Sequence, residues 1–218
     1  ALGFSPFLIL ATDSVIIIAM NAVLQYYGGK ENGDTLITAA TIVQSYMLLI
    51  TSPMLGITGG SQPLISYNYG ANQPDRIRKT VFCVLMLCLC FTTVMFLASR
   101  AIPEVFVRIF TSDAEYRELA VWGIRVFTMM IIPLSFQYVF VDSLTALGMT
   151  GKSLTLSLFR KTLYFVSTCV LPICFAANAA FYAEPIADGV SSVLSTGVFF
   201  FVYRKYLKGS GRLMEIKV

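Results

Sequence analysis

Histidine is absent from this 218-residue sequence, and charged residues are scarce. Charged side chains make up 13% of the chain, against roughly 25% in soluble domains. The absence of histidine removes the most frequent metal ligand and general base of proteins. Hydrophobic residues account for 56% of the chain, and its mean hydropathy is +0.74. A soluble core cannot accommodate so much apolar sequence, so the composition indicates a protein embedded in a lipid bilayer.

Signatures of enzymes, metal proteins and secreted proteins are missing as well. The five cysteines lie inside apolar segments, without the spacing of a metal site, and we interpret them as small hydrophobic side chains. No arrangement of cysteine, serine or paired acids suggests catalysis, so we predict neither an enzyme nor a cofactor. The first residues, ALGFSPF, lack the basic stretch and cleavage site of a signal peptide. Because the chain begins with Ala1 and not with Met, we expect it to start inside a longer protein.

Six segments are long and apolar enough to be membrane-spanning helices, which require about 20 residues each. The short connections between them predict an all-α, polytopic transmembrane bundle without a soluble domain. Strands are disfavoured, because those of a membrane barrel would be alternating segments of about ten residues. The predicted spans are residues 4–27, 36–57, 81–102, 119–147, 162–183 and 185–203. Together they form one lobe over residues 1–206, followed by a basic cytoplasmic tail at 207–218.

Two features are expected to interrupt the helices. Residues 59–80, GGSQPLISYNYGANQPDRIRKT, are rich in Gly, Pro and Asn and are predicted to be a loop between the second and third spans. Pro133 is expected to divide the fourth span, because proline frees a backbone carbonyl and bends a helix. We weigh a static kink against a hinge or a set of exposed carbonyls at a substrate cavity.

Lys and Arg residues are distributed unequally between the two sets of connections. Eleven lie on the side of both chain ends, against four on the other side. The positive-inside rule therefore predicts that both termini are cytoplasmic. We read the net charge of +4 as this topology signal and not as a nucleic-acid-binding surface. The eleven residues are Arg76, Arg78, Lys79, Lys152, Arg160, Lys161, Arg204, Lys205, Lys208, Arg212 and Lys217.

Ionisable residues inside a membrane cost at least ~2.5 kcal/mol on insertion scales, so they are candidate functional residues. Asp13 lies about nine residues into the first span, ~13 Å deep, near the midplane. Tyr138 and Asp142 lie one helical turn apart on the fourth span, so both can contact one ligand or proton. A buried carboxylate can carry a proton, coordinate Na⁺ or balance a cationic substrate. The alternatives are a polar contact between helices for Asp13 and a position at the cytoplasmic rim for Asp142.

Neutral polar residues near these three extend the candidate site. Asn21 and Gln25 follow Asp13 on roughly the same side of its helix. Ser135 belongs to the same polar stripe as Tyr138. We predict that Asn21, Gln25, Gln44 and Ser135 line a substrate cavity.

A further polar stripe on the sixth span contains Glu184 and Asp188. Both lie near the predicted outer end of that span, where an acid is cheaper to place and therefore less diagnostic. An interfacial or structural role is the simpler interpretation of these two acids. Arg125 lies about one turn inside the outer interface, where snorkelling of its long side chain explains it.

Four segments resemble, in order, the multidrug and toxin extrusion (MATE) family of cation-coupled efflux transporters, most closely its bacterial branch. They are LGFSPFLILATDSVIIIAMNAVLQYYGG, SPMLGITGGSQPLISYNYGANQPDRIRKT, ALGMTGKSLTLSLFRK and AEPIAD. The stretch QPLISYNYGA is the most specific of them. That family has twelve helices in two pseudo-symmetric six-helix lobes, and the present segments resemble the C-terminal lobe. The resemblance therefore implies that an N-terminal six-helix lobe, on the same or a separate chain, is a partner.

The resemblance also implies roles for individual residues. Some Na⁺-coupled members use an acid on the first helix of the C-terminal lobe, together with a Tyr and an Asp one turn apart on the fourth. Asp13, Tyr138 and Asp142 match this pattern by residue type and span, although Asp142 lies nearer to the cytoplasmic end. By this likeness they are the candidate coupling residues for H⁺ or Na⁺, with Na⁺ as the only metal ion considered.

The function implied is cation-coupled antiport of drug-like, often cationic amphipathic compounds out of the cell. The chain would be the C-terminal half of such an exporter in the inner (plasma) membrane, in contact with membrane lipid and with the drug molecules. Two alternatives stay open. One is a lipid-linked sugar flippase of the same superfamily, which would favour a more cationic cavity. The other is a truncated membrane subunit that packs against a partner without transporting.

Overall fold

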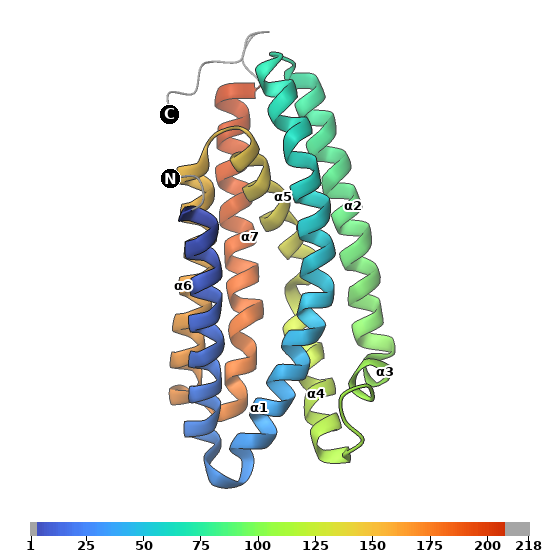
Figure 1. Cartoon of the computed structure of the whole chain (residues 1–218), viewed down its shortest axis with the longest axis vertical. Helices are drawn as coiled ribbons and strands as arrows, with labels where there is room; N and C mark the ends of the chain where they lie inside the picture. The colour runs from blue at the N-terminus through green and yellow to red at the C-terminus, as the bar shows by residue number, and fades with distance from the viewer. Residues whose placement is uncertain (1–3, 208–218) are drawn as a thin grey trace.

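The computed structural model describes residues 4–207 as an elongated bundle of long helices (Figure 1). Short 3₁₀ turns, η1 (Thr128–Met130) and η2 (Ala177–Tyr182), follow α4 and α6, and a π-helical turn, η3 (Tyr203–Leu207), extends α7. No strand occurs among the described residues, and the all-α prediction is confirmed. Of the predicted tail, all but Leu207 lies outside the described residues. The helices are α1 (Phe4–Gly70), α2 (Pro74–Ala101), α3 (Pro103–Val107), α4 (Ala114–Phe127), α5 (Ile131–Ala146), α6 (Thr150–Cys174) and α7 (Ala183–Val202).

Helix α1 is a hairpin of two helical arms rather than one straight rod. Its backbone turns at Gly29, whose φ of 68° and ψ of −165° are not helical. Glycine adopts a positive φ without steric cost. Gly28 is equally constrained, because a Cβ there would lie 2.9 Å from the Cα atom of Gly33. The first arm descends beside α6 and the second returns beside α2 and α5 (Figure 1).

The second arm of α1 extends beyond the end of its predicted span, and the prediction of a loop over residues 59–80 is wrong. The helix continues to Gly70, and only residues 71–73 separate it from α2. Tertiary contacts hold this extension: the Ser66 hydroxyl donates to the Ala146 carbonyl at 2.8 Å, and Ile65 is buried against α2 and α5. Packing of this kind overrides local propensity. The change of direction then falls on Asn72, with φ 54°.

The fourth predicted span is broken where its proline suggested. Helix α4 ends at Phe127, η1 occupies residues 128–130, and α5 begins at Ile131. Pro133 is the third residue of α5. Its ring would clash with the carbonyl of Met129 in a continuous helix, and it cannot donate the corresponding hydrogen bond. The irregular turn therefore lies directly before the proline.

Helix α6 begins twelve residues before the predicted fifth span, at Thr150 instead of residue 162. Arg160 and Lys161 thus lie inside the helix, roughly 15 Å from its start, and their assignment to a cytoplasmic loop is wrong. Removing these two residues from the eleven leaves nine Lys and Arg against four. The charge bias that predicts the orientation keeps its sign.

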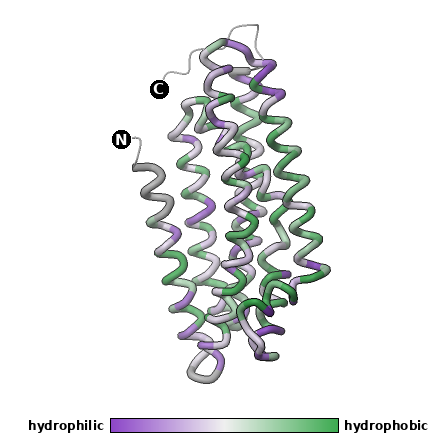
Figure 2. Tube along the Cα trace, turned by 45° about the vertical axis from the view of Figure 1, so that its right-hand side comes forward, coloured by the Kyte–Doolittle hydropathy of each residue, from purple (hydrophilic) through white to green (hydrophobic). Residues whose placement is uncertain are grey.

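Five helical stretches in the described residues are long and apolar enough to cross a membrane. The first arm of α1 adds a further helical segment, beside α6 (Figure 1). Figure 2 shows hydrophobic residues along the length of the helices and hydrophilic residues gathered mainly at the two ends of the bundle. Many large apolar side chains, such as Leu97, Ile173 and Val193, are exposed, as expected for surfaces that face lipid or another protein. The stretches are Asn32–Gly70, Pro74–Ala101, Ala114–Ala146, Thr150–Cys174 and Ala177–Lys205.

Close packing at Gly123 joins α4 to its neighbours. A Cβ atom at this position would lie 2.8 Å from Cγ2 of Val43 and 3.0 Å from Cε1 of Phe181. Both of these side chains are fully buried in the core cluster that also contains Phe127. A side chain at position 123 would therefore have to displace one of them, so Gly123 allows the close approach of α4 to α1 and η2.

Replacement of Gly123 by Ala is therefore expected to destabilise the bundle by about 1–3 kcal/mol through overpacking. Gly197→Ala on α7 is the matched control, because nothing lies within 4 Å of its Cβ position and alanine favours helix by up to ~1 kcal/mol. Thermal unfolding of both variants in detergent measures the difference. Equal midpoints would contradict the packing described at Gly123.

Candidate functional site

A charged cluster lies between α6 and α7. The Arg160 guanidinium on α6 donates through Nη1 to Asp188 Oδ1 at 2.7 Å and to Glu184 Oε1 at 3.2 Å. Glu184 and Asp188 lie four residues apart on α7, so both point from one face of that helix toward the same arginine. The Asp188 side chain is 0% exposed, and those of Arg160 and Glu184 are 10% and 12% exposed. Three ionisable groups are thus nearly removed from solvent.

A second ion pair extends the cluster to α1. The Lys161 ammonium donates to Asp13 Oδ1. Lys161 follows Arg160 directly, so the two cations leave α6 in different directions, one toward α7 and the other toward the first arm of α1. The Asp13 side chain is 38% exposed, which makes it the most accessible acid of the cluster. We refer to Asp13, Arg160, Lys161, Glu184 and Asp188 as the charged cluster.

Two tyrosines flank the charged cluster. The Tyr164 hydroxyl, one turn beyond Arg160 on α6, lies within hydrogen-bonding range of Glu184 and 3.3 Å from Met20 Sδ. Tyr138 on α5 is close enough to Arg160, Asp188, Glu184 and Asp13 to interact with their charges. The structure therefore brings two of the predicted coupling residues, Asp13 and Tyr138, to one region.

Asp142, the third predicted coupling residue, lies apart from the charged cluster. Its carboxylate is hydrogen-bonded to side chains of the second arm of α1, Thr58 and Gln62. Its Oδ2 atom is buried without a hydrogen-bond partner. No ion pair involves Asp142 among the described side chains. Tyr138 and Asp142 share a helix, but they face different surroundings.

The residues predicted to line a substrate cavity are scattered. Ser135 is fully buried, and its hydroxyl lies 2.8 Å from that of Thr92 on α2, so it joins two helices. Gln44 donates to Met20 Sδ at 3.4 Å, near the charged cluster. Gln25 lies against Gly33 at the α1 bend. Asn21, next to Met20, is half-buried.

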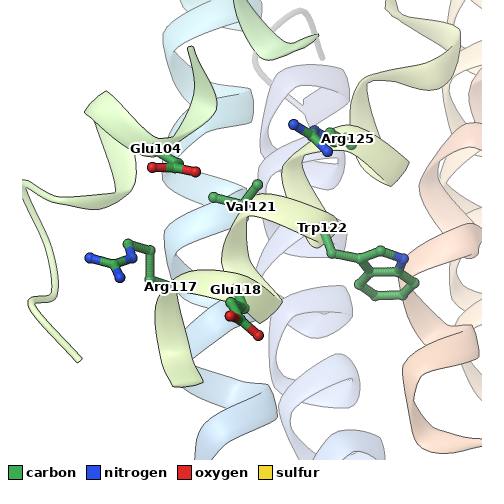
Figure 3. A pocket seen from close by; sticks show the side chains of 6 residues that line it. All are labelled: Glu104, Arg117, Glu118, Val121, Trp122 and Arg125. Atoms are coloured by element: carbon green, nitrogen blue, oxygen red, sulfur yellow. The ribbon is translucent and has the colours of Figure 1, made fainter. Parts of the chain in front are cut away.

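Two hollows of the described bundle lie at the end that contains α4. The larger, about 560 Å³, is lined by residues of the α1 bend, the start of α4 and η2, among them Gly28, Glu115 and Asn178. The smaller, about 190 Å³, is formed by α3 and α4 (Figure 3). Its wall mixes acids and arginines and includes Trp122. Neither hollow is lined by a residue of the charged cluster.

Sequence reasoning missed the cationic half of the charged cluster. Hydropathy favoured a boundary after Arg160 and Lys161, because each charge is costly when considered alone. A usable signal was nevertheless present: Glu184 and Asp188 form an i, i+4 acidic pair in the region of a predicted span. Their negative charges require a nearby cation. In the described part of the chain, no group of three or more His, Cys, Asp or Glu side chains is arranged to hold a metal ion. An ammonium group already compensates the Asp13 carboxylate, the predicted Na⁺ ligand.

Comparison with known proteins gives consistent matches. The MatE family profile matches residues 10–177. The multidrug export protein MepA of Staphylococcus haemolyticus is 22% identical over 225 residues, which cover 99% of this chain and 46% of that protein. The FAD transporter of Shewanella oneidensis is 24% identical over 133 residues, which cover 61% of this chain and 29% of that protein. The chain thus spans less than half the length of these relatives.

Solved structures show the same partial coverage. The structure of the MATE multidrug transporter DinF-BH is 29% identical, with a TM-score of 0.77, over 93% of this chain and 44% of that one. A MATE crystal structure in the bent conformation reaches a TM-score of 0.85 at 14% identity, over 96% of this chain and 46% of that one. The described bundle therefore corresponds in fold to slightly less than half of each transporter.

Replacement of Arg160 by Leu is expected to destabilise the bundle by about 3–5 kcal/mol, because two buried acids lose their cation. Arg108→Leu provides the control: its ion pair with Glu104 is 3.5 Å long and mostly exposed, and such pairs contribute at most ~1 kcal/mol. Thermal unfolding at mildly alkaline pH, where the acids take up protons least readily, compares the two. An Arg160→Leu midpoint no lower than that of Arg108→Leu would remove the structural role of the arginine.

Proposed function

Because the chain belongs to the MatE family, we propose that it is the C-terminal six-helix lobe of a transporter that exports drug-like compounds in exchange for a cation. The observation that carries this proposal is the buried charged cluster, because ionisable residues inside a membrane mark ion or substrate pathways. The names of the relatives, multidrug export protein among them, support the transport class. An N-terminal lobe completes the exporter in this proposal, and the substrate binds between the two lobes.

The proposed coupling residues are Asp13, Tyr138 and Asp142. Asp13 is the most exposed acid of the charged cluster, which makes it the acid that an ion or a substrate reaches first. Asp142 supports the proposal independently, since it is a buried carboxylate with one oxygen lacking a hydrogen-bond partner. Protonation would give that oxygen a hydrogen to donate. Of the two candidate ions, H⁺ fits this environment better than Na⁺, because Lys161 already neutralises Asp13.

The proposed substrates are amphipathic and often cationic. Arg160 and Lys161 add two cations to the interior of the bundle, but both are paired with carboxylates. With three acids against two bases, the ionised cluster carries a net charge of −1 and therefore attracts positive ligands. This balance favours an exporter of cations over a lipid-linked sugar flippase, whose phosphates require uncompensated bases. Membrane lipid is the surrounding partner, and the proposed location is the inner membrane.

Neutralising the coupling acids tests the exchange. Asp13→Asn and Asp142→Asn, in the full-length product of the gene, are each expected to reduce ion-driven ethidium efflux by about tenfold or more, equivalent to at least ~1.4 kcal/mol. Asp34→Asn, at an exposed position of α1, is the control and is expected to transport normally. The assay follows uptake of the dye by inverted vesicles under an imposed pH or Na⁺ gradient. Undiminished efflux in both variants would remove the assigned role.

The proposed orientation, with both ends of this chain cytoplasmic, is tested by labelling single cysteines in a cysteine-free variant. Ser112→Cys lies between α3 and α4, and Gln73→Cys lies between α1 and α2; both positions are exposed. An impermeant maleimide applied to intact cells is expected to label the cysteine at 112 and not that at 73. Position 73 lies on the side that carries nine of the Lys and Arg residues, and the positive-inside rule places that side in the cytoplasm. The reverse labelling pattern would refute the orientation.

A further inference from the structure

The charges between α6 and α7 do not balance. Lys161 and Asp13 compensate each other, which leaves Arg160 alone to compensate both Glu184 and Asp188. If every group were ionised, this buried part of the cluster would carry one uncompensated negative charge. Such a charge is strongly unfavourable in a low-dielectric interior. One further positive charge is therefore required at this point.

The geometry indicates where that charge belongs. Both acids accept a hydrogen bond from the same nitrogen, Arg160 Nη1, at 2.7 Å for Asp188 and 3.2 Å for Glu184. The Asp188 side chain is 0% exposed, and its second oxygen, Oδ2, is buried without a hydrogen-bond partner. A buried acceptor without a donor is rare in folded proteins. A proton on this pair of carboxyl groups removes the excess charge and turns an oxygen into a donor.

We infer that Glu184 and Asp188 together form a binding site for one proton, with Arg160 as the fixed cation of the site. The elements packed around the pair contribute charged or titratable groups to its environment: Asp13 from α1, Tyr138 from α5, and Lys161 and Tyr164 from α6. Na⁺ is disfavoured at this site, because it requires several oxygen ligands and would meet two neighbouring cations.

The site deepens the coupling mechanism, and its part in transport rests on the exchange proposed above. With the proton bound, the five-residue cluster is neutral. Without it, the cluster carries a charge of −1 and attracts a cation from the proposed substrate site between the two lobes. A proton and a cationic substrate would then compete for one negative charge, which is the condition for exchanging one for the other. The acids at the α6–α7 contact would thereby act in addition to Asp13 and Asp142.

Infrared difference spectroscopy tests the site directly. The full-length protein in lipid nanodiscs is titrated with acid and base, and the carbonyl stretch of a protonated carboxyl group is followed apart from the carboxylate bands. The wild type is expected to show such a band for the Glu184–Asp188 pair. Asp188→Asn and Glu184→Gln are each expected to abolish it, because either change removes the excess negative charge that retains the proton.

Two controls make the assignment specific. Asp34→Asn removes an exposed acid, and Asp142→Asn removes the other carboxyl group that has a buried oxygen without a hydrogen-bond partner; both are expected to leave the band of the pair in place. Loss of the band in only one of the two pair variants, or in neither, would overturn the shared site. If Asp188→Asn does not fold, the comparison of Glu184→Gln with Asp142→Asn still tests the site. Glu184→Gln is expected to fold, because Glu184 is 12% exposed and glutamine has the same shape as glutamate.

The infrared and transport results together distinguish failure of the proton site from failure of the proposed exporter function. If the band responds as expected but ethidium efflux does not depend on the pH gradient, the proton site is supported and its role in transport is rejected. Efflux driven by the pH gradient, without a band that depends on the pair, would reject the site and retain the exporter.

Discussion

Compensation of charge in the absence of water is the constraint on which this bundle depends. Arg160, Glu184 and Asp188 are surrounded by helices instead of solvent, and neither acid is tolerable there in ionised form without the arginine. Their ion pairs fix the rotation and the relative height of α6 and α7. Lys161, the next residue on α6, forms an ion pair with Asp13 and thereby holds the first arm of α1. Helices α6 and α7 and the first arm of α1 are thereby aligned by one pair of adjacent bases.

The other side of the bundle is joined by weaker polar contacts. Thr92 and Ser135 connect α2 to α5 through their hydroxyl groups at 2.8 Å, and Thr128 donates to Ser99 at 2.9 Å. Neutral contacts of this kind hold helices together without creating a net charge. The described side-chain contacts are thus neutral between α2 and α5 and charged between α6 and its neighbours α1 and α7.

The fold was largely accessible from the sequence, because uncharged apolar runs of sufficient length have few alternatives to a membrane helix. The break before Pro133 was also accessible, since it follows from the covalent structure of proline. The position of α6 was not, because the partners of Arg160 and Lys161 are 24 to 148 residues away and a hydropathy window does not register them. The same limit explains residues 59–70, where burial of Ile65 and the bond from Ser66 to Ala146 outweigh the local glycines and Pro63. Asp13 and Tyr138 were proposed from residue type, and their roles stay predictions, whereas Glu184 and Asp188 were given less weight because no cation near them was visible in the sequence.

The tight turn at Gly28 and Gly29 has a consequence for how the chain enters the membrane. It joins the two arms of α1 so closely that they enter the bilayer as one hairpin, with Asp13 in the first arm. Lys161 follows 148 residues later. At a synthesis rate of about 5–20 residues per second, that interval lasts roughly 7–30 s. During this time Lys161 is not available to Asp13, so the nascent hairpin has to keep that carboxyl group at the water boundary until α6 arrives.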